Sequence, residues 1–483
     1  MSDRVEYAAG EPTELRGWAD TKFANVVAAF DAALPGDGRH GAALSVWING
    51  RPAVEVQGGV ADHQAPRRWV QDTLTPVHSC TKGVSAVAVA LLIERGLLES
   101  YEVLLSSIWP EFAAAGKEGV TVGDALAHRA GLSAPRETLT REQLLDGETL
   151  AASLARQEPI WKPGTTHQYH ALTHGVFAEQ IVKRLDGRTL GRFLFEEVAR
   201  PLSADLWIGL PLSEWGRLAQ PGSVAEDGGD PDGLPDESPI PDQARYWLER
   251  ATNLGGALPL TSFVDTSIYA AEMAGAGGVA SASGLARLWS ATVVPTNGVR
   301  LLSDETLEAM TAPRSVGRPY LGGRPPYQSW GAGVMIPSAW ERYLTPSSFG
   351  HDGGGGMVAF ADPEYRVGFR IRDEQARNLA ARPIRRRPTR QSADVSAAIL
   401  HAHPTGSCQS GCGAAIAGRW RSGSNQCRWS TPPLSTPAYA SSAAVSRFSY
   451  QRSVRPPSTG QCMVRPLAAQ HTMRLGNSRG RKR

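Results

Sequence analysis

A serine and a lysine three residues apart are the sharpest chemical feature of this 483-residue sequence. Ser79 and Lys82 open an apolar stretch typical of a helix, and residues three apart share one helix face. A serine hydroxyl becomes a nucleophile when a nearby base removes its proton, and a lysine with a lowered pKa can be that base. A helix N-terminus would also favour negative charge developing beside Ser79. The alternative is an N-capping serine followed by a surface lysine.

A tyrosine downstream could move the same proton. Tyr169 lies just before a predicted helix, and a phenol near a lysine ammonium can have a depressed pKa and act as a proton shuttle. His170, its neighbour, is a candidate for the substrate pocket. The alternative for His170 is a structural role, which is common for a single histidine before a helix.

A glycine run, Gly353–Gly356, follows His351 and leads into a predicted strand. Glycines in a strand let a substrate approach the main chain closely, and a backbone N–H near Gly354 could bind an oxyanion. The run does not match a phosphate-binding P-loop, which requires Lys-Ser/Thr followed by a helix. The G-x-S-x-G motif of α/β-hydrolases is absent from the chain.

Helices and strands must bring these motifs together. Apolar spacing predicts helices over Trp18–Ala33, Lys82–Arg95, Gly123–Ala130, Leu172–Leu185 and Gly278–Thr292. Asn49-Gly50 predicts a hairpin between residues 43–48 and 53–57. A second hairpin is predicted around Asp362-Pro363-Glu364, and residues 330–336 resemble a strand. Strands at both ends with helices between them predict an α+β fold built on an antiparallel sheet.

The motifs together resemble serine hydrolases related to class C β-lactamases and penicillin-binding proteins, including family VIII carboxylesterases. Three elements match in order: Ser79-x-x-Lys82, Tyr169-x-x and His351-x-Gly353, the last where relatives carry Lys-Thr-Gly. Further similar stretches begin at His128, Pro163 and Gly277. The resemblance covers roughly residues 15 to 369. It implies a β-lactamase-like fold, in which helices flank the antiparallel sheet and part of them forms a helical subdomain.

The resemblance also implies a mechanism. Ser79 would attack the carbonyl of a small ester or amide, and water would then hydrolyse the acyl-enzyme. Lys82 and Tyr169 would share the base and acid roles, and the sequence leaves open which takes the serine proton. Backbone N–H groups of Ser79 and of a residue near Gly354 would form the oxyanion hole, while His351 and Gly353 would line the substrate site. We expect no cofactor and no metal.

One position departs from the pattern. The tyrosine motif of β-lactamases and peptidases of this group usually ends in asparagine, whose amide orients the substrate amide. Ala171 stands at that position and can donate no hydrogen bond. The substitution favours esters over β-lactams or peptides.

Charge divides the chain near residue 374. From Gln375 onward there are 18 basic residues, 17 of them arginine, and one acidic residue, Asp394. The first 374 residues hold 32 basic and 46 acidic residues, so the two parts carry +17 and −14 within a net charge of +3. We therefore expect one hydrolase domain over residues 1–370 and a disordered Arg/Ser/Pro-rich tail over 371–483.

The tail itself has several interpretations. Its composition changes abruptly where relatives continue into a closing C-terminal helix, so we hypothesise that it is translated out of frame. Dispersed arginines without a recognisable module argue against nucleic-acid binding. Three cysteines and two histidines there lack the paired C-x₂-C spacing of zinc sites: Cys408, Cys412, Cys427, His401 and His403.

Other segments bear on what covers the active site and on where in the cell the protein is located. Residues 221–242 hold seven acidic residues and no Lys or Arg, which is typical of a surface loop or a lid over the active site. The N-terminus does not resemble a signal peptide, and the longest apolar run, Val84–Ile93, is half the ~20 residues of a membrane span. A cytoplasmic location without a membrane span is therefore expected. No feature of the sequence sets an oligomeric state.

Three functions follow from this pattern. The first is a serine hydrolase that acts on small carboxylic esters through an acyl-enzyme. The second is a β-lactamase, a D-Ala-D-Ala peptidase or another amide hydrolase. The third is a catalytically defective product, because the closing helix of the fold is missing.

Overall fold

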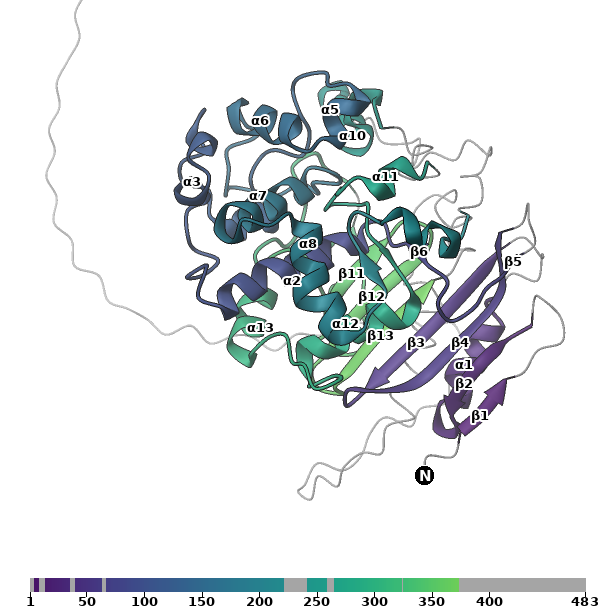
Figure 1. Cartoon of the computed structure of the whole chain (residues 1–483). Helices are drawn as coiled ribbons and strands as arrows, with labels where there is room; N and C mark the ends of the chain where they lie inside the picture. Colours follow the sequence, from purple (N-terminus) through teal and green to yellow (C-terminus); the bar gives the residue numbers. More distant parts are fainter. Residues whose placement is uncertain are drawn as a thin grey trace, which may run out of the picture. The chain divides into compact units, whose positions relative to one another are not determined.

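The predicted antiparallel sheet is present in the computed structural model, which describes residues 4–7, 14–34, 40–62, 67–220, 241–258, 265–323 and 325–372 (Figure 1). The acidic stretch predicted as a loop or lid lies outside these residues, except for its last two positions. The tail predicted over 371–483 lies outside them from residue 373 onward. Its first two positions are an exception, because Ile371 and Arg372 belong to strand β13 and therefore to the domain.

Ten strands of the described residues form one antiparallel sheet in the order β1-β2-β4-β3-β13-β12-β11-β10-β9, with β5 paired to β4. A smaller antiparallel sheet has the order β6-β8-β7. The strands are β1 (Arg4–Tyr7), β2 (Arg16–Asp20), β3 (Gly41–Ile48), β4 (Arg51–Asp62), β5 (Arg67–Arg68), β6 (Thr75–Pro76), β7 (Leu206–Trp207), β8 (Val279–Ala280), β9 (Ser329–Trp330), β10 (Met335–Ile336), β11 (Phe349–Gly353), β12 (Met357–Asp362) and β13 (Val367–Arg372).

Most helices lie between β6 and β9 in the sequence, and Figure 1 shows α5, α6 and α7 gathered in a helical lobe beside the sheet. The helices are α1 (Ala24–Asp31), α2 (Cys80–Glu94), α3 (Leu105–Ile108), α4 (Val122–Leu126), α5 (Arg141–Leu145), α6 (Glu148–Arg156), α7 (His174–Asp186), α8 (Leu190–Leu194), α9 (Arg200–Leu202), α10 (Asp242–Asn253), α11 (Ser267–Ala270), α12 (Ala282–Val293) and α13 (Asp304–Thr311).

Both predicted hairpins are confirmed. Asn49 and Gly50 have φ values of 52° and 74° and join β3 to β4, as a two-residue turn of this type requires. The second hairpin joins β12 to β13, with Asp362 opposite Val367. The helix that carries Lys82 ends as predicted, because Gly96 adopts a left-handed φ of 69° just after it.

Four predicted elements differ from the structure. The helix predicted over Gly123–Ala130 ends at Leu126, and the helix predicted over Gly278–Thr292 begins only at Ala282, because Val279 and Ala280 form strand β8. The opening helix begins later than predicted, because residues 18–20 belong to strand β2, where Trp18 pairs with Glu6 on β1 and Glu55 on β4. Strand pairing on both sides here outweighs the local helical pattern. The strand predicted over residues 330–336 is a pair of two-residue strands, β9 and β10, that face each other.

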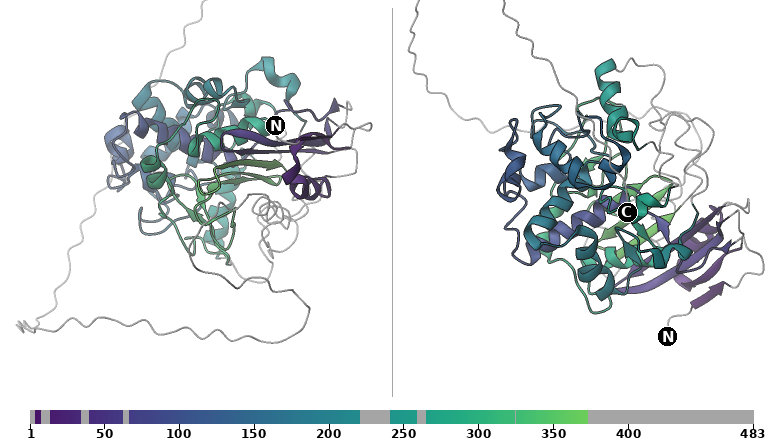
Figure 2. Two further views of the ribbon diagram at one scale, coloured as in Figure 1. Left: turned by 90° about the horizontal axis from the view of Figure 1, so that it is seen from below. Right: turned by 45° about the horizontal axis from the view of Figure 1, so that its top comes forward.

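Helices cover both faces of the sheet, and Figure 2 shows these helices on either side of the strands. On one face, Val27 and Phe30 of α1 pack with Val54 and Phe369 of the sheet. On the other face α12 lies close to β13, because Gly368 has no side chain: a Cβ there would lie 2.3 Å from the Ala286 carbonyl oxygen. Helix α2 is buried on nearly all sides between α7 and β11, which places its N-terminus at the end of the sheet.

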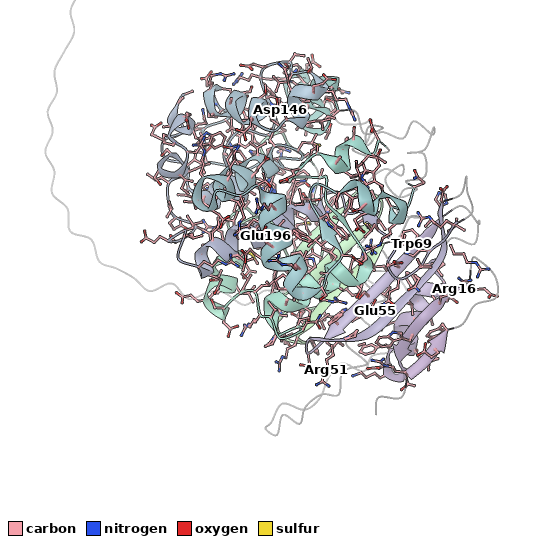
Figure 3. All side chains as sticks on the ribbon, viewed as in Figure 1. Arg16, Arg51, Glu55, Trp69, Asp146 and Glu196 are labelled. Carbon is pink, nitrogen blue, oxygen red and sulfur yellow. The ribbon has the colours of Figure 1, made fainter. Side chains whose placement is uncertain are left out.

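A buried carboxyl group joins α12 to the sheet. Glu55 lies on β4 (Figure 3) and accepts hydrogen bonds from Ser45 (2.8 Å), Trp47 (3.0 Å) and Ser283 of α12 (2.9 Å). Burial raises the pKa of Glu55 above its usual range.

No helix among the described residues has both the length and the apolar character needed to cross a bilayer.

Candidate active site

Ser79 stands where the chain enters α2. His78, the residue before it, has a left-handed φ of 47°, and Ser79 itself is already helical, with φ −67°. Ser79 occupies the N-cap position of α2, as the alternative interpretation placed it, but its side chain caps no helical N–H group. Its hydroxyl is half-buried and serves other partners.

The amine of Lys82 is one of those partners. Lys82 is fully buried and its Nζ donates to Ser79 Oγ (3.0 Å) and to the carbonyl oxygen of Gly275 (2.8 Å). Burial lowers the pKa of Lys82 to about 7, and the charge of Asp352 opposes this shift. The interpretation of Lys82 as a surface lysine is therefore wrong, and a large share of the amine is neutral at pH 7.

The phenol of Tyr169 is the second partner of Ser79. Tyr169 donates a 2.8 Å hydrogen bond to Ser79 Oγ, and its ring stacks on Trp330 with centroids 5.4 Å apart. Lys82 Nζ lies 4.9 Å from the centroid of the same ring. Burial raises the pKa of Tyr169, although the hydrogen bond to Ser79 acts in the opposite direction. The expected depression of this pKa is wrong, because the loss of hydration and the charge of Asp352 raise it and together outweigh the hydrogen bond to Ser79.

His351 places a neutral imidazole beside the rings of Tyr169 and Trp330. It is fully buried, and its ring centroid lies 5.3 Å from that of Trp330 and 6.4 Å from that of Tyr169. Its Nδ1 donates to the carbonyl oxygen of Asp352 at 2.5 Å, and no described residue hydrogen-bonds its Nε2. Burial, with the charge of Lys82, lowers the pKa of His351 to about 3. His351 therefore brings no positive charge to the position where relatives carry a lysine.

The end of strand β11 lies against the first turn of α2. A Cβ on Gly353 would lie 2.6 Å from the Val77 carbonyl oxygen and 3.3 Å from the Cys80 nitrogen. A Cβ on Gly354 would have room, since its nearest neighbour is 3.8 Å away. In the described part of the chain, β10 pairs with β11 only at Gly350, so β10 does not cover the last three residues of β11. The backbone near Gly353 is thus beside Ser79 and open on one side.

His170 is placed beneath this site. It is fully buried, its Nδ1 donates to the Gln168 carbonyl oxygen at 2.6 Å, and its Nε2 accepts from the Leu132 N–H at 3.1 Å. Burial lowers the pKa of His170 to about 3. Because both ring nitrogens bind the main chain, the geometry favours the structural alternative over a place in the pocket.

The sequence did not assign three neighbours of the site. Gly275 supplies the second acceptor for Lys82, Trp330 supports the Tyr169 ring, and His128 lies with its ring centroid 5.0 Å from that of Tyr169. His128 had a detectable signal, because it begins a stretch that resembles the family. Gly275 and Trp330 lie outside the stretches that do. Among the described residues no cluster of His, Cys, Asp or Glu could hold a metal ion.

Most of the described chain is similar to known proteins. Residues 23–372 match the family described as Beta-lactamase. The chain belongs to the beta-lactamase family. "Esterase/beta-lactamase LipL" of Mycobacterium tuberculosis is 32% identical over 374 residues, which are 74% of this chain and 82% of LipL.

Two solved structures share the fold of this chain. A penicillin-binding protein homologue from Caulobacter crescentus has a TM-score of 0.68 and 32% identity, over 81% of this chain and all of the other. A family VIII carboxylesterase has a TM-score of 0.68 and 30% identity over the same shares. The β-lactamase-like fold and the resemblance found in the sequence are confirmed, and the chain is a serine hydrolase of this family.

Proposed function

We propose that this beta-lactamase-family protein is a carboxylesterase that acts on small esters through an acyl-enzyme on Ser79. The observation that carries the proposal is that Ser79 Oγ accepts hydrogen bonds from both Lys82 Nζ and the Tyr169 hydroxyl. The names of LipL and of the family VIII carboxylesterase support an ester substrate. Ala171 supports it too, because it offers no amide to a substrate amide.

Acylation begins on the neutral form of Lys82. The amine takes the hydroxyl proton as Ser79 Oγ bonds to the carbonyl carbon, and the carbonyl π electrons move to the oxygen. The N–H groups of Ser79 and of a residue near Gly354 bind this oxyanion, at ~3 kcal/mol for each donor. When the oxyanion collapses, the bond to the alcohol breaks. Tyr169 gives its proton to the departing oxygen and regains one from Lys82.

Deacylation repeats these steps with water in place of Ser79. The neutral amine of Lys82 takes a proton from water, whose oxygen bonds to the acyl carbon. The tetrahedral intermediate then releases Ser79, which recovers its proton through Tyr169, and the carboxylic acid leaves. Opposite pKa shifts suit the two roles, since Lys82 is neutral enough to accept a proton and Tyr169 stays protonated enough to donate one.

The test compares the wild-type protein with Ser79→Ala on p-nitrophenyl butyrate. The wild type is expected to release nitrophenol, and the variant is expected to lose nearly all of this activity. A fluorophosphonate probe should label the wild type at Ser79, as mass spectrometry of peptides would show. Labelling would exclude the catalytically defective product, whereas activity that survives in Ser79→Ala would overturn the proposal.

A β-lactamase activity is the second candidate, favoured by the name of LipL. Nitrocefin hydrolysis by the same preparation separates the two functions. We expect kcat/KM for nitrocefin to be far below that for the butyrate ester, because Ala171 cannot orient the lactam amide. A larger value for nitrocefin would favour the β-lactamase instead.

A further inference from the structure

The carbonyl group that binds Lys82 belongs to a short segment, residues 272–275, which Glu272 fixes to the start of α8. One carboxylate oxygen of Glu272 accepts a hydrogen bond from the Thr189 hydroxyl, and the other accepts one from the Gly191 N–H, both at 2.9 Å. Thr189 and Gly191 form the start of α8. Glu272 therefore ties its segment to the N-terminus of that helix.

The side chain of Glu272 fits into a slot between two glycines. A Cβ on Gly191 would lie 2.9 Å from Glu272 Cδ, and a Cβ on Gly209 would lie 2.9 Å from Glu272 Cγ. A Cβ on Gly191 would also lie 2.1 Å from the Ile208 carbonyl oxygen, so neither glycine position has room for a side chain beside the glutamate. The slot thus fixes the side chain on both sides as well as at its carboxylate.

The other end of the segment lies against α2, the helix that carries Lys82. Gly275 packs against α7 so closely that a Cβ on Gly175 would lie 2.1 Å from the Gly275 nitrogen. Two successive carbonyls of the segment face α2: Ala274 accepts from Ser85 Oγ at 2.7 Å, and Gly275 accepts from Lys82 Nζ at 2.8 Å. The fixed carboxylate and the Lys82 acceptor are three residues apart in one chain segment.

We propose that Glu272 is a positioning residue that holds the Gly275 carbonyl against Lys82. This inference rests on the proposed function, in which Lys82 takes the serine proton. A carbonyl acceptor directs one N–H of the amine away from Ser79, so the lone pair can turn toward the hydroxyl. It also favours the ammonium form, so its loss should lower the pKa of Lys82 further.

A cavity beside the segment gives it room to move when the carboxylate is removed. The cavity is lined by Glu272 and Gly275 of the segment, by Glu179 and Lys183 of α7, and by Glu148. Burial and the nearby carboxylates of Glu272 and Glu148 raise the pKa of Glu179 to about 7, while Lys183 opposes this shift. Asp146, labelled in Figure 3, adds a further negative charge. Because Glu179 titrates near the same pH as Lys82, its effect must be separated in any pH experiment.

The groups that act on Lys82 itself come from several elements. The charge of Asp352 on β11 raises its pKa. The Cys80 thiol on α2 stays neutral where Lys82 titrates, because burial raises its own pKa. The imidazoles of His128, His170, His174 and His351 face it with lowered pKa values, and are therefore neutral near pH 7. None of these groups lies in the cavity beside Glu272, so a change at Glu272 reaches Lys82 through the segment.

The experiment measures kcat/KM against pH for Glu272→Ala, Glu272→Gln and Glu179→Gln, with active sites counted by fluorophosphonate labelling. Glu272→Ala is expected to lose roughly 10- to 100-fold in kcat/KM per active site, because the Lys82 amine is misplaced. The acid limb of its kcat/KM profile, where kcat/KM rises with pH, should also move to lower pH, because the pKa of Lys82 is lowered. Glu272→Gln should restore the wild-type profile, since its amide can accept from Gly191 and donate to the Thr189 oxygen. Glu179→Gln, which removes a carboxyl group from the same cavity, should also match the wild type.

A wild-type rate per site and a wild-type acid limb in Glu272→Ala would overturn the inference, even if that variant were less stable. If Glu272→Ala does not fold, Glu272→Asp keeps the charge, withdraws the carboxylate by one methylene, and should shift the acid limb in the same direction. An unshifted limb in Glu272→Asp would also overturn it. Failure of the proposed function is recognised separately, by activity that survives in Ser79→Ala.

Discussion

The phenol of Tyr169 donates a 2.8 Å hydrogen bond to Ser79, although 90 residues separate the two in sequence. Ser79 Oγ also accepts from Lys82, so both candidate proton carriers converge on one oxygen atom. Burial acts on them in opposite senses: it disfavours the ammonium of Lys82 and the phenolate of Tyr169. This difference assigns the base role to Lys82 and the donor role to Tyr169 in the proposed mechanism.

The first prediction concerns pH. If neutral Lys82 is the base, kcat/KM should rise with pH and reach half of its maximum near pH 7, where the free-enzyme amine loses its proton. Well below that pH the value should fall tenfold per unit, because the ammonium has no lone pair. A pH-stat assay of acid release avoids the titration of nitrophenol itself. A kcat/KM that still rises above pH 10 would instead point to Tyr169 as the base, because burial raises the pKa of this phenol.

The second prediction removes one oxygen atom. Tyr169→Phe keeps the ring on Trp330 but loses the donor to Ser79 and to the leaving alcohol, so kcat/KM, which reports acylation, should fall about 10²- to 10³-fold. The thermal unfolding midpoint should change little, because the stacked ring is retained. Esters of more acidic alcohols need less proton donation and should suffer a smaller loss. An equal loss for all leaving groups would contradict the donor role of Tyr169.

The site is only partly visible in the sequence. The Ser79–Lys82 pair follows from helical spacing, and the hairpin at Asn49-Gly50 follows from turn chemistry, since both depend on neighbours within a few residues. The bond from Lys82 to Gly275 spans 193 positions and has no local signal. The pKa direction of Tyr169 likewise depends on burial by distant segments.

The third prediction separates the two roles of His170. His170→Ala leaves the buried Leu132 N–H without its acceptor and opens a cavity, which should cost about 3 kcal/mol of unfolding free energy. The folded fraction should keep kcat/KM within about threefold of wild type once active sites are counted by the fluorophosphonate label. A large loss of kcat/KM with an unchanged unfolding midpoint would show that His170 belongs to the substrate pocket.

The fourth prediction uses two adjacent glycines as a matched pair. In Gly353→Ala the new methyl group would lie 2.6 Å from the Val77 carbonyl oxygen, so β11 and the first turn of α2 must separate. That movement displaces the backbone N–H groups proposed to bind the oxyanion, and kcat/KM should fall roughly 100-fold.

Gly354→Ala is the control, because its methyl group has no neighbour closer than 3.8 Å. Neither glycine has a positive φ, so alanine adds no backbone strain at either position and the two variants differ mainly in this contact. We expect Gly354→Ala to keep most of the wild-type kcat/KM, as measured with p-nitrophenyl butyrate at a pH where the wild-type kcat/KM has reached its maximum. Equal losses in both variants would mean that access to the site, rather than the approach of β11 to α2, limits the reaction.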